Sequence, residues 1–152
     1  MESSIIQKYE GKDIKYLLGR AEKYFNLFIR LRDTDDNGYG RCISSGNLLR
    51  IPSSNAHAGH YFSAGKYPRL KFDERNVHLQ GKSDNYFNHG NESSYRIKLV
   101  EKIGAEEVES MEFVSKNRSI YKWNRYYLIE VIETYKKKAK ELSKRKMFKV
   151  TI

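Results

Sequence analysis

The feature that most constrains the fold is the stretch from His57 to Asn91, which reads HAGHYFSAGKYPRLKFDERNVHLQGKSDNYFNHGN and holds all four histidines of the chain. Residues 57–62 and 76–80 predict two short strands, because apolar and polar residues alternate in the second of them. A turn with glycine and proline joins them at 63–68, and a short helix is expected over 84–89. The stretch therefore predicts a hairpin followed by a helix.

Helices are predicted on both sides of this hairpin, from apolar residues spaced three and four apart. The first begins at Asp13, whose side chain can cap it, and its apolar stripe includes Leu17, Ala21 and Phe25. Residues 1–10 read as a frayed lead-in. Further helices are expected over 94–103, 106–114 and 121–144, and an edge strand over 148–152.

The composition favours a polyanionic partner. The formal net charge is +10 and the pI is about 9.6, which favours nucleic acid and predicts strong salt dependence; a basic protein without such a ligand is the alternative. No apolar run approaches the roughly 20 residues that span a bilayer. The N-terminal residues lack the order of a secretion signal, and one cysteine excludes an intramolecular disulfide. We therefore expect a cytoplasmic protein with no membrane partner.

Three side chains in the central stretch suit phosphodiester hydrolysis, which needs a base to deprotonate water and a cation to stabilise the leaving oxygen. His60 suits the base, because an imidazole titrates near neutral pH. Asn85 suits the cation, because its amide oxygen is a hard ligand that Mg²⁺ accepts. Asn76 is expected to hold the loop between the strands by hydrogen bonds and so to orient His60. A hairpin followed by a helix would bring these side chains into one cleft.

The order of His60, Asn76 and Asn85 resembles that of the HNH (His-Me finger, ββα-metal) endonucleases. More narrowly, the chain resembles the bacteriophage lambda NinG (Rap) recombination-protein family. Four ordered blocks carry this resemblance: AEKYFNLFIRLRD at 21–33, CISSG at 42–46, AGHYFSAGKYPRLKFDERNVHLQ at 58–80 and GNESSYRIKLVEKIG at 90–104.

The resemblance implies cleavage of branched DNA, such as Holliday junctions, during phage recombination, with a divalent metal ion, Mg²⁺ or Mn²⁺. His60 would be the general base, Asn76 the loop-fixing residue and Asn85 a metal ligand. The implied fold is α+β, a ββα-metal finger embedded among helices in a single domain, 1–152. An N-terminal helix would occupy 13–33, the HNH-like core 41–91 and a C-terminal helical part 92–146. A homodimer would suit a two-fold junction.

The chain departs from the family where zinc is concerned. The family's two cysteine pairs fall at positions that read Cys42, Ser45, Gly81 and Asp84 here. Cys42, with Asp84 as a weak ligand, cannot close a tetrahedral site. We therefore expect no structural zinc and a scaffold held by packing, with aromatic side chains around Tyr61, Phe62, Phe72, Tyr86 and Phe87.

The second ligand of the catalytic metal is open. Many HNH enzymes have an acidic residue or histidine directly before the base, where this chain has Gly59. His57, three residues before the base, would serve if the strand bends. Other candidates are Asp73, Asp84, His78 and His89.

Basic residues around the expected cleft are candidates for phosphate contacts, which position a duplex without reading its sequence. Arg96 would grip a phosphate or brace Glu101 or Asp84 in a salt bridge. Tyr67 would stack at a junction or be buried. The candidate DNA-binding residues are Lys66, Arg69, Lys71, Arg75, Lys82 and Arg96.

Three functions are compatible with these features. The favoured one is a divalent-metal-dependent endonuclease that acts on branched DNA. The second is a DNA-binding recombination protein that keeps the HNH fold and has lost the nuclease activity. The missing zinc thiolates and the glycine at position 59 favour this alternative. The third is an accessory factor that binds another protein through the long C-terminal helix. A lack of DNA affinity at low salt would indicate this third function.

Overall fold

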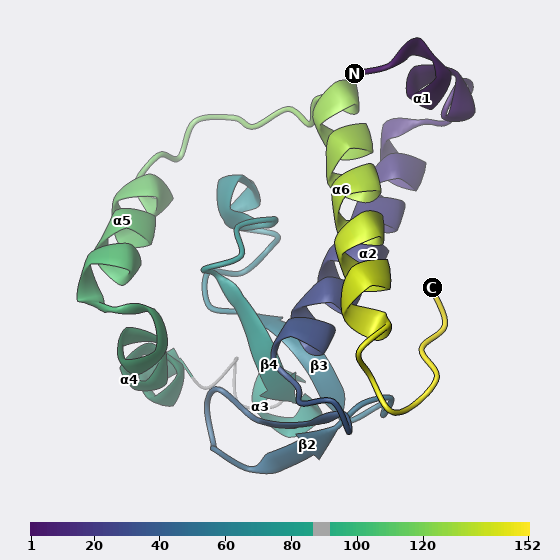
Figure 1. Cartoon of the computed structure of the whole chain (residues 1–152). Coiled ribbons are helices and arrows are strands. Elements are labelled where there is room, and N and C mark those ends of the chain that lie inside the picture. Colours follow the sequence, from purple (N-terminus) through teal and green to yellow (C-terminus); the bar gives the residue numbers. More distant parts are fainter. Residues whose placement is uncertain (87–91) are drawn as a thin grey trace.

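The computed structural model describes residues 1–86 and 92–152. In chain order the elements are α1 (Ser3–Lys8), α2 (Ile14–Arg32), β1 (Tyr39–Arg41), β2 (Leu48–Arg50), β3 (Ala56–His60), the 3₁₀ turn η1 (Pro68–Leu70), β4 (Val77–Gly81), α3 (Lys82–Tyr86), α4 (Glu92–Ile103), α5 (Ala105–Ser115) and α6 (Arg125–Ser143). Two small antiparallel sheets lie between the helix pair α2–α6 and the helix pair α4–α5 (Figure 1). The fold is α+β, as the sequence predicts.

The helices α2 and α6 lie side by side and run parallel (Figure 1). Each begins at a side chain that caps its first turn: Asp13 accepts a hydrogen bond from the Tyr16 amide at 2.8 Å, and Asn124 accepts one from the Tyr127 amide at 3.0 Å. At the far end, Lys146 donates to the carbonyl of Leu31 at 2.9 Å. The larger hydrophobic core lies between these helices and the β3–β4 hairpin, and includes Phe25, Phe28, Val77, Leu79, Leu128, Ile132 and Tyr135.

The β3–β4 hairpin is the central element, with His60 opposite Val77 and Gly59 opposite His78. Side chains on β4 alternate as predicted, but both of its faces are buried. Val77 and Leu79 pack into the α2–α6 core, whereas the ring of His78 lies 6.1 Å from that of Tyr95 on α4. The hairpin is therefore covered by helices on both sides.

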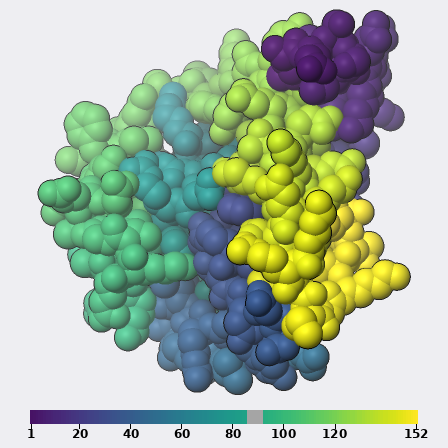
Figure 2. Space-filling model, viewed as in Figure 1, coloured from purple at the N-terminus to yellow at the C-terminus, as the bar shows by residue number. Residues whose placement is uncertain are grey.

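A smaller core lies under α4 and α5. It consists of Ile43, Leu70, Tyr95, Leu99, Val108 and Met111. Gly104 separates the two helices at φ +92°, a left-handed conformation that favours glycine, and so turns the chain back on itself. In Figure 2 the green surface of these helices occupies the left side, and the light-green to yellow surface of α6 and of the C-terminal residues the right, with blue and teal segments between them.

Three expectations for the ends of elements are wrong. Residues 1–10 contain the helix α1, and the Tyr9 side chain behind it is buried. The helix α6 begins at Arg125 rather than at Tyr121, because Asn124 caps it. Residues 148–152 form no strand; Phe148, Val150 and Ile152 instead pack against the larger core. Among the described residues, no helix has the length and apolar character needed to cross a bilayer.

Candidate active site

A pocket of about 520 Å³ opens beside the end of β3, and both His60 and Asn85 line it. His60 is the last residue of β3, and Asn85 lies in α3, directly after β4. The hairpin-then-helix order therefore brings these two side chains to one cavity. The other lining residues are Ala58, Tyr61, Phe62, Ser63, Ala64, Lys66, Tyr67 and Glu92.

The imidazole of His60 is held in one tautomer. Its Nε2 lies 2.9 Å from the carbonyl oxygen of Lys71, and since a carbonyl only accepts, Nε2 carries the proton. Within the described part of the chain, Nδ1 has no hydrogen-bond partner, so its lone pair can accept a proton. Burial lowers the pKa of His60, and the nearby Lys71 ammonium also lowers it. The imidazole is therefore neutral near pH 7, the form that a general base requires.

Asn76 is fully buried and ties the loop between the strands to the hairpin. Its Oδ1 accepts a hydrogen bond from the Phe62 amide at 2.8 Å. Its Nδ2 donates to the carbonyl oxygens of Phe62 and Leu70, each at 3.0 Å. Because Leu70 directly precedes Lys71, whose carbonyl holds the His60 ring, these contacts fix the support of His60 rather than His60 itself. The hydrogen bonds are those expected of a loop-fixing residue.

The Asn85 side chain is oriented by His57. The Asn85 Nδ2 lies 3.1 Å from His57 Nδ1, and His57 Nε2 lies 2.9 Å from the Ser54 carbonyl. With its amide nitrogen turned to His57, Asn85 can offer its oxygen to a cation. His57 is not among the residues that line the pocket, so the geometry favours a positioning contact for it over the metal ligand that the sequence suggested.

Glu92, the first residue of α4, lines the pocket as well and was missed from the sequence. An acidic residue in the first turn of a helix is favoured by the helix dipole alone. A glutamate at this position therefore does not indicate a functional site. Among the described residues, no three His, Cys, Asp or Glu side chains converge as a metal-binding group. Asn85 and Glu92 nevertheless place two side chains with hard oxygen atoms on the lining of the pocket.

The glycine before His60 is required by the packing of β4. A Cβ atom at Gly59 would lie 2.0 Å from Oε1 and 2.8 Å from Cβ of Gln80, a fully buried side chain on the paired strand. The Gly59 carbonyl also accepts a hydrogen bond from the Tyr95 hydroxyl at 2.6 Å. No side chain can therefore be placed directly before the candidate base in this packing.

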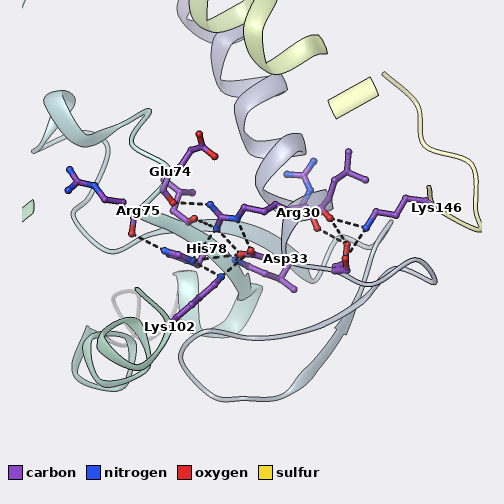
Figure 3. A network of polar contacts seen from close by, with 12 residues as sticks. Arg30, Asp33, Glu74, Arg75, His78, Lys102 and Lys146 are labelled. Atoms are coloured by element: carbon purple, nitrogen blue, oxygen red, sulfur yellow. Dashed lines mark hydrogen bonds and ion pairs between the residues drawn. The ribbon is translucent and has the colours of Figure 1, made fainter. Parts of the chain in front are cut away.

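His78, a further metal candidate, belongs to a polar network on α2, β4 and α4, where it points toward Asp33 and Lys102 (Figure 3). Its Nε2 donates to the Arg75 carbonyl at 2.8 Å, and its Nδ1 accepts from Lys102 at 2.8 Å and from Arg32 at 3.1 Å. Burial and the Lys102 charge lower the pKa of His78 to about 4. Both ring nitrogens are thus used inside the network, away from the pocket. His89 and Phe87 lie outside the described residues.

The Asp33 carboxylate is the anion of this network. Burial by itself raises the pKa of Asp33, but the hydrogen bonds and charge of Arg32, with the charge of Lys102, lower it to about 2. Lys102 lies 3.0 Å from Oδ1, and the Leu79 amide donates to Oδ2 at 2.9 Å. Asp33 directly follows α2, so the network joins the end of that helix to β4 and to α4.

Three of the candidate DNA-binding residues pair with carboxylates of the protein. The nitrogen–oxygen distance is 2.5 Å for Lys71 with Glu22, 2.7 Å for Arg75 with Asp73, and 3.0 Å for Arg96 with Glu112. The salt-bridge alternative for Arg96 is therefore the observed one, although its partner is neither Glu101 nor Asp84. Asp73, a metal candidate in the sequence, is occupied by Arg75.

The remaining candidates differ from one another. The Arg69 guanidinium donates to the carbonyls of Asn117 and Ser119, at 3.3 and 3.1 Å, and so holds the segment between α5 and α6. Lys66 is exposed and lines the pocket. Lys82 is exposed at the start of α3. Lys66 and Lys82 are the candidates best placed to meet a phosphate.

Comparison with known proteins decides the family. The profile described as "Bacteriophage Lambda NinG protein" matches residues 2–145. The chain belongs to the NinG family. It is 34% identical over 137 residues to the Protein ninG of Escherichia phage lambda, covering 90% of this chain and 62% of that protein. The corresponding protein of Enterobacteria phage H19B is 38% identical over 118 residues, 78% of this chain and 54% of the relative.

The chain therefore spans between about half and two thirds of the length of these NinG relatives. The Protein ninG of Salmonella phage P22 gives the same picture, with 35% identity over 137 residues and 63% of that protein covered. No solved structure matches the chain.

The four positions at which the resemblance to the NinG family implies zinc ligands come together in space. The Cys42 thiol donates to Asp84 Oδ2 at 3.4 Å, and its sulfur accepts from the amides of Gly81 at 3.3 Å and Ser45 at 3.5 Å. Cys42 and Asp84 are buried. A hydrogen-bonded cluster thus joins the β1–β2 turn to the end of β4.

Proposed function

We propose that this NinG-family chain hydrolyses phosphodiester bonds in branched DNA, with His60 as the general base. The observation that supports it most is the shared pocket: an imidazole with one nitrogen held by a backbone carbonyl, and a carboxamide oriented by a second histidine, line one cavity. A nuclease site needs a base and a cation ligand within reach of one phosphate.

In this proposal His60 Nδ1 takes a proton from the attacking water. The Lys71 carbonyl, 2.9 Å from Nε2, keeps the ring in the required tautomer and stabilises the imidazolium that forms. Since burial lowers the pKa of His60, the imidazole is available as a base from slightly acidic pH upward. Asn76 keeps the carbonyl in place through its hydrogen bonds to the loop.

The oxygen atoms of Asn85 and Glu92 would hold a divalent cation, Mg²⁺ or Mn²⁺, for which hard oxygen ligands are suited. When bound, the cation would supply charge stabilisation at the phosphate and at the leaving oxygen. His57 would keep the Asn85 amide turned so that its oxygen faces the pocket. The net charge of +10 supports a DNA substrate, and the likeness to phage NinG proteins supports a role in phage recombination.

The test is His60→Ala. The purified variant should bind a four-way DNA junction as the wild type does, but cut it at least about 100-fold more slowly in Mg²⁺ or Mn²⁺, the usual scale of a lost general base. Asn85→Ala should raise the metal concentration needed for half-maximal cutting. Equal cutting rates for His60→Ala and wild type would remove His60 from the mechanism.

The second candidate function is a DNA-binding recombination protein that does not cut. Gly59 favours it, because the packing of Gln80 excludes the metal ligand that many HNH enzymes have directly before the base. Calorimetric titration with Mg²⁺ and Mn²⁺ separates the two functions. No metal binding at millimolar concentration, together with intact junction binding, would favour this second function.

A further inference from the structure

The segment between α5 and α6, residues 116–124, reads KNRSIYKWN and contains no acidic residue. Lys116, Arg118 and Lys122 are exposed on it. Between these cations lies Ile120, whose side chain is 89% exposed, the highest value among the large exposed hydrophobic residues of the described chain. Single exposed apolar residues are common on protein surfaces, but this one is framed on both sides by positive charge.

The chain on either side of Ile120 is held in place. Before it, Arg69 donates to the Asn117 and Ser119 carbonyls and also to the Ser119 hydroxyl, at 2.8 Å. After it, the ring of Trp123 lies 5.6 Å from that of Phe72, which belongs to the larger core. The segment forms an arch between the two helix pairs (Figure 1). Ile120 is therefore presented outward on a pre-organised backbone and is not covered by its own chain.

The arch adjoins the candidate active site. The Arg118 guanidinium lies over the ring of Tyr67, 5.0 Å from its centroid, and the Arg69 guanidinium lies 5.2 Å from the Tyr121 centroid. Tyr67 and Lys66 both line the pocket of His60. The arch is therefore within reach of a nucleic acid that has one phosphate in this pocket.

We propose that Ile120 is a wedge that inserts at the branch point of DNA bound at the pocket, with Lys116, Arg118 and Lys122 holding the flanking phosphates. Apolar side chains of some DNA-binding proteins insert between base steps and unstack them, at a cost of a few kcal/mol per step. At a branch point the terminal pairs lack a stacking neighbour on one side, so insertion costs less there than in a continuous duplex. The cations would contribute to binding of any DNA, whereas Ile120 would contribute only at a branch. This inference rests on the proposed function, because it assumes that DNA occupies the pocket.

The experiment compares Ile120→Ala with wild type for binding to a four-way junction and to a duplex of the same sequences, in EDTA so that no strand is cut. We expect about a tenfold loss of junction affinity, the scale of burying a few aliphatic carbons, and unchanged duplex affinity. A 2-aminopurine base at the branch point should brighten on binding wild type and stay quenched with Ile120→Ala. Met147→Ala is the matched control, because Met147 is 78% exposed and follows the opposite end of α6.

The outcomes separate this inference from the proposed function. Equal junction affinities and equal 2-aminopurine signals for Ile120→Ala and wild type would overturn the wedge, whether or not the protein cuts DNA. A selective loss of junction affinity with Ile120→Ala would support the wedge even if His60→Ala cut as well as wild type, which would overturn only the catalytic role of His60. No binding of either DNA by the wild type at low salt would overturn both.

Discussion

Replacing Asn76 with alanine should destabilise the protein more than any other asparagine-to-alanine change near the pocket. Asn76 has no exposed surface and makes three hydrogen bonds, one to the Phe62 amide and two to the carbonyls of Phe62 and Leu70. Alanine fills none of these roles. The change would leave the partly buried Phe62 amide and the Phe62 carbonyl without this partner, whereas the Leu70 carbonyl would keep its hydrogen bond from the Asp73 amide at 3.3 Å.

The expected magnitude follows from those three contacts. A buried donor left unsatisfied costs roughly 1–3 kcal/mol, and a carbonyl with a second lone pair costs less. We expect the free energy of unfolding to fall by about 2–4 kcal/mol. Since a domain of this size is stable by roughly 5–15 kcal/mol, the variant should still fold at low temperature. Within the folded state, the loop that carries the Lys71 carbonyl should loosen, and His60 should lose its orientation.

Urea unfolding measures the first effect, and exchange of the Phe62 amide hydrogen measures the second. Asn85→Ala is the matched control, because Asn85 is only partly buried and its side chain has, within the described residues, one hydrogen bond, to His57; the loss should stay at about 1 kcal/mol. A loss below about 1 kcal/mol for Asn76→Ala, or equal losses for both variants, would refute the view that Asn76 fixes the loop.

Two further results are expected. His78 has its pKa lowered from 6.5 to about 4 by burial and by Lys102; the folded state thus binds fewer protons than the unfolded chain, and stability should fall as pH drops from about 6.5 toward 4. His78→Gln should flatten that slope in urea unfolding, and an unchanged slope would contradict it. Changing Ser45, Gly81 and Asp84 together to cysteine should create a zinc site of four thiolates with Cys42. A Cβ atom at Gly81 would lie 4.0 Å from the Cys42 sulfur, which is close enough for a shared site. Failure to bind one equivalent of zinc, detected by cobalt substitution and absorption, would show that the positions do not converge.

Local signals were enough to predict the elements that hold the pocket. The Asp13 cap and the apolar spacing after it mark α2, and alternation over 76–80 marks β4 and the faces of its side chains. Both are readable because they depend on residues within a few positions of each other. The convergence of His60 and Asn85 then follows from hairpin-then-helix order, without any knowledge of distant contacts.

Contacts between distant segments could not be predicted in this way. Arg75 reaches Glu107 at 2.9 Å across 32 residues of sequence, and Arg96 reaches Glu112. The sequence shows that these residues are basic but not which carboxylate faces them, so Arg75 was predicted to contact phosphate, and Arg96 to contact phosphate or to pair with Glu101 or Asp84. Glu92 was missed for a related reason. Its place in the pocket depends on how α4 packs beside the hairpin. Partner choice requires the tertiary packing, which no local pattern encodes.

The division of the apolar interior into two cores has a consequence for the proposed function. Ala58, on one side of the pocket, packs against the core of α2 and α6, whereas Tyr61 and Phe62, on the other, pack against the core of α4 and α5. Separation of the smaller core from the hairpin would widen the cavity while the long helix pair stayed folded. Under the proposed function, access of DNA to the pocket and the stability of the long helix pair would then depend on different contacts, so that a substitution could change one and leave the other in place.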